Sequence, residues 1–161
     1  MDDPLGPHDL EIARRFTAGR AAVWRCLTEP ALIGEWFCPR PWRATDIIIE
    51  LVPGGRFSTI IRGPEGEVHD EGPGCVLDVA APSRLVWTSA LGPGWRPLPA
   101  APGGLAFTAV MTLRDAGDGG TLYAARALHA TAEARQRHAA MGFAEGWGAA
   151  ADQLGTLALT L

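Results

Sequence analysis

The stretch HAAMGFAEGWGAAADQLGTLALTL, residues 138–161, decides the fold. Its apolar side chains recur at alternating spacings of four and three residues, which is typical of one face of a helix. We expect this helix to run from about residue 131 to residue 161. Its apolar stripe consists of Phe143, Trp147, Ala150, Leu154, Leu157 and Leu161. A helix with one apolar face has to cover another apolar surface.

Three glycines, Gly142, Gly146 and Gly148, lie close together inside the predicted helix. Each costs about 1 kcal/mol relative to alanine in a helix interior, so their presence needs a reason. Gly142 and Gly146 form, with Ala149, a smooth strip beside the apolar stripe. Such a strip either lets a neighbouring backbone approach closely or leaves a hollow that a ligand could fill. The two uses are compatible, because a small residue at a cavity mouth can serve both.

The rest of the chain predicts one strand, two short helices and a run of about six strands joined by short turns. Such a run forms an antiparallel sheet, and only the C-terminal helix is long enough to cover it. The predicted fold class is therefore α+β, with a single domain over residues 10–161 after a flexible leader over residues 1–9. The predicted strands cover 10–18, 44–52, 56–62, 67–82, 83–91, 105–115 and 121–130, the short helices cover 19–30 and 31–37, and a Pro/Gly-rich loop covers 92–104.

Composition excludes several functional classes. The net charge is -4 and no basic tract is present, which argues against a nucleic-acid partner. The N-terminus lacks a secretory signal, and no apolar stretch approaches the ~20 residues of a membrane span. The three cysteines, Cys26, Cys38 and Cys75, form no C-x-x-C pair and leave one over, so we expect a reducing cytoplasm rather than a disulfide framework.

Short motifs along nearly the whole chain resemble the START-like, Bet v 1-like (SRPBCC) helix-grip superfamily. They resemble in particular bacterial stand-alone domains of the branch named after the activator of heat-shock-protein-90 ATPase. These motifs are VWRCLTEPALIGEWF (23–37), PGGRF (53–57), RGPEG (62–66), APSRLVWT (81–88), GGTLYAA (119–125), GFAEGW (142–147) and DQL (152–154). The resemblance implies a curved antiparallel sheet that wraps around the long C-terminal helix, with an apolar pocket between them.

Six tryptophans are many for a chain of 161 residues, and aromatic side chains often line ligand pockets. We expect Trp24 and Trp147 to be packed in the core, whereas Trp36, Trp42 and Trp95 are as well suited to a pocket as to packing. Two histidines, His69 on a strand and His129 before the helix, are candidates to orient a ligand, although structural roles for both remain open. The predicted ligand-binding set is Trp36, Trp42, Phe57, His69, Trp87, Trp95, His129, Met141, Gly142 and Gly146.

No catalytic, cofactor or metal motif accompanies these residues. None of the three serines lies in G-x-S-x-G, and no H-E-x-x-H or Cys/His metal spacing occurs. Glu67 and Glu71 would share a strand face with His69, which suggests either an acid/base pair or a solvated strand edge.

We therefore expect a protein that binds a small hydrophobic or amphipathic molecule between the sheet and the C-terminal helix. Two alternatives remain open. One is a co-chaperone-like or stress-response module that binds a protein partner. The other is an enzyme of the cyclase, dehydratase or hydrolase type, as the resemblance allows. The eukaryotic chaperone activator carries a further N-terminal domain for which 161 residues leave no room. A homodimer is also open.

Overall fold

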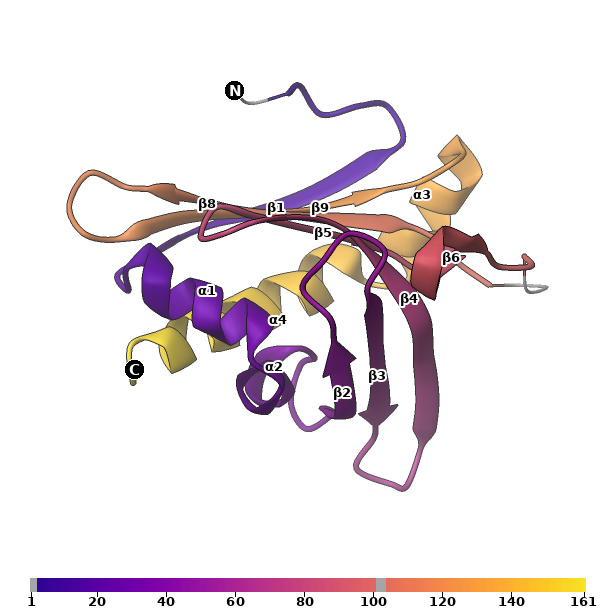
Figure 1. Ribbon diagram of the computed structural model, residues 1–161, viewed down its shortest axis with the longest axis horizontal. Helices are drawn as coiled ribbons and strands as arrows, with labels where there is room; N and C mark the ends of the chain where they lie inside the picture. Colours follow the sequence, from indigo (N-terminus) through magenta and orange to yellow (C-terminus); the bar gives the residue numbers. More distant parts are fainter. Residues whose placement is uncertain (1–2, 101–103) are drawn as a thin grey trace.

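The computed structural model describes residues 3–100 and 104–161. Seven long strands and four α-helices make up most of the molecule (Figure 1). The strands of the main sheet are β1 (Asp9–Phe16), β2 (Arg43–Ile49), β3 (Arg56–Arg62), β4 (Val68–Ala80), β5 (Arg84–Thr88), β8 (Thr108–Asp115) and β9 (Thr121–Leu128). The helices are α1 (Arg20–Thr28), α2 (Pro30–Trp36), α3 (Ala132–Ala140) and α4 (Phe143–Ala158).

The seven strands form one antiparallel sheet in the order β1-β9-β8-β5-β4-β3-β2. Register shifts in the β2–β3, β3–β4 and β4–β5 pairs increase the local twist and bend that side of the sheet. Residues 68–74 of β4 pair with β3 alone, beyond the start of the β5 ladder at Cys75. We call β2, β3 and residues 68–74 of β4 the arm. Figure 1 shows the arm extending away from the plane of the other strands.

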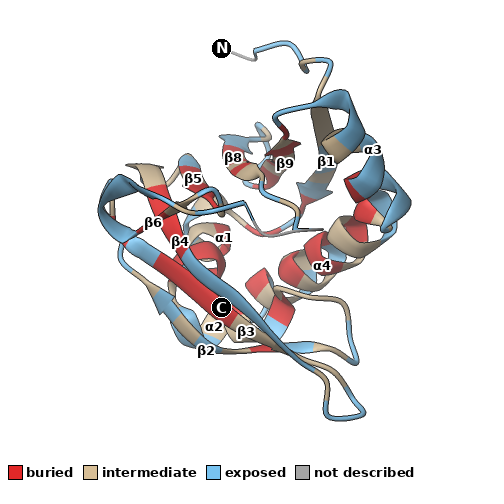
Figure 2. Cartoon of the chain, turned by 90° about the vertical axis from the view of Figure 1, so that its right-hand side faces the viewer, coloured by how far each residue is buried: buried red, intermediate tan, exposed pale blue. Residues whose placement is uncertain are grey.

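Helix α4 crosses the concave side of this sheet, and its buried residues face the strands (Figure 2). It packs against β1, α1 and α2. Arg14 of β1 lies along it and donates a hydrogen bond from Nε to Asp152 at 2.9 Å. The predicted α+β helix-grip architecture, with two short helices after the first strand, is thereby confirmed.

One predicted element was wrong. The expected single helix over residues 131–161 is two helices, α3 and α4, which are separated at Met141 and Gly142. Thr131 caps the start of α3 by accepting a hydrogen bond from the amide of Ala134, and Gly142 adopts a φ of 94° before α4 begins. A residue other than glycine is strained in this left-handed region. Gly142 therefore lies at a helix boundary and does not interrupt a continuous helix.

The predicted loop over residues 92–104 also contains more structure than expected. Its first part forms a two-stranded ladder between β6 (Leu91–Gly92) and β7 (Arg96–Pro97), joined by the 3₁₀ turn η1 (Pro93–Trp95). Leu91, which the sequence assigned to the preceding strand, belongs to this ladder because β5 ends at Thr88. Residues 101–103 of the loop lie outside the described residues.

Candidate functional site

A cavity of about 880 Å³ lies between the arm, the first half of α4 and the segment that follows β7. It is partly open to solvent. Its floor is formed by β5, β8 and β9, from which Trp87, Met111 and Tyr123 contribute side chains. The helical boundary at Met141 and Gly142 lies on its rim, so the break between α3 and α4 is part of the site.

Aromatic rings form most of the apolar wall. Phe57 of β3 packs against Trp87 of β5 with ring centroids 4.7 Å apart, and Phe37 packs on Phe57 at 5.8 Å. Phe107 continues the wall from Trp87 at 5.7 Å and reaches Trp147 of α4, also at 5.7 Å. The rings therefore connect the arm to the helix around the cavity.

The glycines of α4 explain why space remains between the helix and the sheet. A Cβ atom placed on Gly146 would have no atom of another element within 4 Å, whereas one on Gly148 would lie 2.7 Å from the Arg14 guanidinium. A Cβ on Gly155 would lie 2.6 Å from the Phe16 ring. The expected hollow is found beside Gly146, whereas the close contacts at Gly148 and Gly155 are with side chains and not with a neighbouring backbone. Gly146 borders the cavity, and Gly148 and Gly155 allow close packing against β1.

Three polar side-chain atoms in the cavity have no hydrogen-bond partner among the described residues. Thr59 is 1% exposed and its Oγ1 is fully buried without a partner. Tyr123 Oη and His138 Nε2 are also unpartnered, and they keep contact with accessible space because neither is among the fully buried unpartnered atoms. An unsatisfied buried polar group is costly, so the Thr59 hydroxyl would gain from a partner, while Tyr123 Oη and His138 Nε2 offer a ligand two accessible polar atoms.

The charged side chains in the described lining of the cavity are acidic. Two exposed carboxylates, Asp70 and Glu71 at the end of the arm, contribute to the lining, and no arginine does so among the described residues. The chain contains no lysine. The described lining therefore offers no cation to pair with an anionic ligand.

His138 at the end of α3 is held by a second histidine. Its Nδ1 lies 2.9 Å from Nε2 of His129, and His129 Nδ1 lies 2.8 Å from the backbone carbonyl oxygen of His8. The rings of Phe107, Phe143 and Trp147 surround His138. Burial, followed by the nearby His129, lowers the pKa of His138 from 6.5 to about 4, so His138 is neutral at pH 7.

Two further titratable groups of the cavity, Cys38 and Tyr123, stay protonated near neutral pH. Burial raises the pKa of the Cys38 thiol to about 11, so it stays protonated and is a poor nucleophile. Burial also raises the pKa of the Tyr123 phenol. No group of three or more His, Cys, Asp or Glu side chains in the described part of the chain could hold a metal ion.

Six residues of the predicted set line the cavity: Trp36, Phe57, Trp87, Met141, Gly142 and Gly146. His129 does not line the cavity itself, but it contacts His138, which does. Three others, Trp42, His69 and Trp95, lie elsewhere and drop out of the candidate site.

Trp42 and His69 stack on each other at the far part of the arm, with ring centroids 5.8 Å apart. Trp42 instead lines a second hollow of about 730 Å³ between α2 and β2. His69 shares a strand face with Glu71, as expected, but no hydrogen bond between them occurs among the described residues. Of the two alternatives left open for these residues, the acid/base pair is not formed in this structure, and His69 and Glu71 are exposed. Glu67 accepts a hydrogen bond from the amide of Glu65 in its own hairpin.

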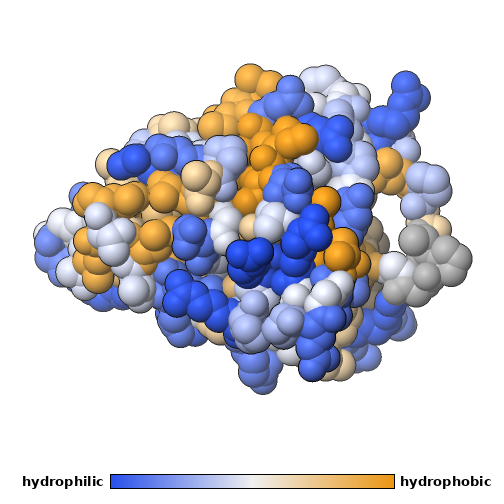
Figure 3. Space-filling view, turned by 90° about the horizontal axis from the view of Figure 1, so that it is seen from below, coloured by the Kyte–Doolittle hydropathy of each residue, from blue (hydrophilic) through white to orange (hydrophobic). Residues whose placement is uncertain are grey.

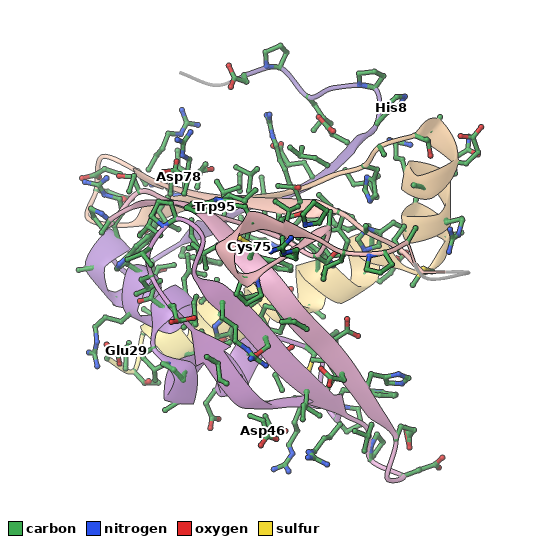
Figure 4. All side chains as sticks on the ribbon, turned by 45° about the vertical axis from the view of Figure 1, so that its right-hand side comes forward. His8, Glu29, Asp46, Cys75, Asp78 and Trp95 are labelled. Atoms are coloured by element: carbon green, nitrogen blue, oxygen red, sulfur yellow. The ribbon has the colours of Figure 1, made fainter. Side chains whose placement is uncertain are left out.

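Trp95 is 54% exposed and lies over the turn between β2 and β3. A Cβ on Gly54 would lie 2.8 Å from its ring, so glycine is needed for this close contact. Figure 4 shows Trp95 near Cys75 of β4, and Trp95 is not among the residues that line the cavity.

Sequence reasoning missed four groups of the cavity, namely Thr59, Phe107, Tyr123 and His138. The alternation of β9 places Tyr123 on the buried face, so the strand pattern could have found it. No local pattern indicates the pairing of His138 with His129, because the pairing depends on the turn between β9 and α3.

The comparisons with known proteins agree with this architecture. The family described as "Activator of Hsp90 ATPase homolog 1-like protein" matches residues 17–158. A crystal structure from Nitrosomonas europaea is 42% identical with a TM-score of 0.86, and the match covers 94% of each chain. One from Rhodobacter sphaeroides is 30% identical with a TM-score of 0.81, covering 99% of this chain and 97% of the other. None of the curated proteins matches the sequence. No helix in the described ranges is long and apolar enough to span a membrane.

Proposed function

We propose, for a chain that belongs to the family of Activator of Hsp90 ATPase homolog 1-like proteins, that the cavity beside α4 binds a small hydrophobic or amphipathic molecule. One observation carries this proposal. An aromatic-lined hollow of about 880 Å³ contains a buried hydroxyl, that of Thr59, without a partner. Ligand sites typically have volumes of about 300–1,000 Å³ and combine apolar walls with a few polar groups.

The apolar walls would supply most of the affinity. Burial of apolar surface contributes roughly 25 cal/mol per Å², and the rings of Phe57, Trp87 and Phe107 offer large surfaces to a ligand. The unpartnered atoms of Thr59, Tyr123 and His138 would then orient it. A carrier role follows from this combination.

Binding is favoured over the two alternatives. Catalysis through a nucleophile would need an activated side chain, but the raised pKa values of Cys38 and Tyr123 keep both protonated. A module that binds a protein partner would need a continuous apolar surface. On the face shown in Figure 3, the apolar residues form separate patches with hydrophilic residues between them.

We propose the cytoplasm as the setting, since Cys26, Cys38 and Cys75 are all free thiols. A homodimer stays a prediction.

The neutral fluorophore N-phenyl-1-naphthylamine tests the proposal. It fluoresces strongly only in apolar surroundings, and we expect saturable enhancement with one probe bound per chain. The variant Gly146→Leu places a side chain in the cavity and should weaken binding at least tenfold. Ala144→Leu adds a similar side chain at an exposed position of the same helix and should bind like the wild type. Absence of saturable binding, or equal binding by both variants, would contradict the proposal.

A further inference from the structure

The hydrogen-bond partners of His129 and His138 determine which ring nitrogen of each carries the proton. The carbonyl oxygen of His8 can only accept a hydrogen bond, so Nδ1 of His129 must carry the proton that is donated to it. A neutral His129 then has a bare Nε2, which can only accept. Its partner at 2.9 Å, Nδ1 of His138, must therefore be the donor.

This assignment fixes the atom that His138 presents to the cavity. With its proton on Nδ1, the neutral ring has a lone pair on Nε2, and no described residue donates to that atom. His138 is 7% exposed as a whole residue, and its Nε2 atom is not among the fully buried unpartnered atoms of the described residues. The hydroxyls of Thr59 and Tyr123 can rotate to donate or accept, but His138 Nε2 can only accept.

From this geometry, and resting on the proposed ligand-binding function, we propose that the cavity selects neutral apolar molecules that carry a hydroxyl group, with His138 Nε2 accepting the hydrogen bond from that hydroxyl. An ether or ester of the same shape has no donor for this nitrogen. A carboxylate has only lone pairs to place against it.

The charge of the lining supports the same selection. Among the described residues no arginine lines the cavity, whereas Asp70 and Glu71 do. A ligand carboxylate would therefore meet two like charges and no cation. The lowered pKa of His138 means that protonation does not provide a cation at neutral pH.

Competition experiments test this inference. N-phenyl-1-naphthylamine is displaced from the wild-type protein by 1-decanol, by its methyl ether 1-methoxydecane and by decanoate. We expect the alcohol to bind about tenfold more tightly than the ether and more tightly than decanoate. The alcohol donates a buried hydrogen bond to His138 Nε2, whereas the ether and decanoate leave this nitrogen without a donor. In His138→Phe, which removes the acceptor, the alcohol-to-ether affinity ratio should fall to about one. The matched control His69→Phe makes the same substitution at a histidine outside the cavity and should leave the ratio unchanged.

The outcomes separate this inference from the proposed function. If the fluorophore does not bind the wild type, the proposed function itself fails. If the fluorophore binds but the ether or decanoate equals the alcohol, the cavity is a binding site and the hydroxyl selection is overturned.

A measurement on the wild type alone covers the case in which His138→Phe does not fold. Long-range ¹H–¹⁵N correlation spectra report which ring nitrogen carries the proton. We expect the Nδ1–H form for both His129 and His138 near pH 7, and an Nε2–H form of His138 would overturn the inference.

Discussion

At the scale of single residues, His138 gives the protein a pH-dependent stability. The pKa of His138 is 6.5 in an unfolded chain and about 4 in the folded one. The unfolded state therefore takes up the proton first as the pH falls. The contribution is complete above about pH 6.5 and is lost progressively as the pH falls towards 4, amounting to at most about 3 kcal/mol.

Urea unfolding at a series of pH values from about 7.5 to 4 checks this prediction. The wild type should lose stability over this window more steeply than His138→Phe, which has no group to titrate at that position. Parallel profiles for the two proteins would show that His138 titrates normally. The comparison cancels the contribution of the carboxylates, which both proteins share.

Gly142 is a second residue whose backbone determines a local structure. Its φ of 94° separates α3 from α4. Gly142→Ala should destabilise the fold by roughly 1 kcal/mol, because alanine tolerates the left-handed region poorly. Gly142→Asn should cost less, because asparagine adopts this region more readily. Equal denaturation midpoints for the three proteins would contradict the prediction.

At the scale of the element, α4 has two different sides, and two of its glycines should respond oppositely to the same change. Gly146→Ala meets open space and should stabilise the protein by about 0.5–1 kcal/mol through better helix propensity. Gly155→Ala would press on Phe16, whose ring packs on Tyr123 at 5.3 Å, and should destabilise by about 1–3 kcal/mol. Chemical denaturation measures both, and changes of the same sign would contradict this description of the helix.

At the scale of the whole molecule, the order of elements could be predicted because hydrophobic periodicity is a local property. The strands predicted around Ile12, Phe57 and Trp87 correspond to the observed β1, β3 and β5, although the range around Trp87 was extended past Thr88 to Leu91. The helix-grip resemblance then correctly predicted which helix covers the sheet, and the family match confirms the resemblance.

The extent of the cavity could not be predicted in the same way. It depends on how far the arm bends, and the bend arises from register shifts that no short motif encodes. His69 therefore lies on the expected strand face but is stacked on Trp42, away from the cavity. The position of His138 depends on the end of α3 at Ala140, which the sequence pattern did not indicate because it predicted one continuous helix.

Binding should also stabilise the molecule as a whole. A ligand that binds only the folded state adds about 2.7 kcal/mol at a free concentration of 100 times Kd. We therefore expect N-phenyl-1-naphthylamine to raise the melting temperature of the wild type in a concentration-dependent manner. Gly146→Leu should show a clearly smaller rise at the same concentrations, and Ala144→Leu should follow the wild type.

The contact between His129 and His8 has a consequence for mutagenesis. The group that orients the first ring is a main-chain oxygen, so replacing the imidazole at position 8 leaves it in place. A systematic alanine scan would classify that position as silent even though its peptide group determines which nitrogen of His138 carries the proton. Only removal of the N-terminal segment, or an ester in place of that amide, would expose the dependence.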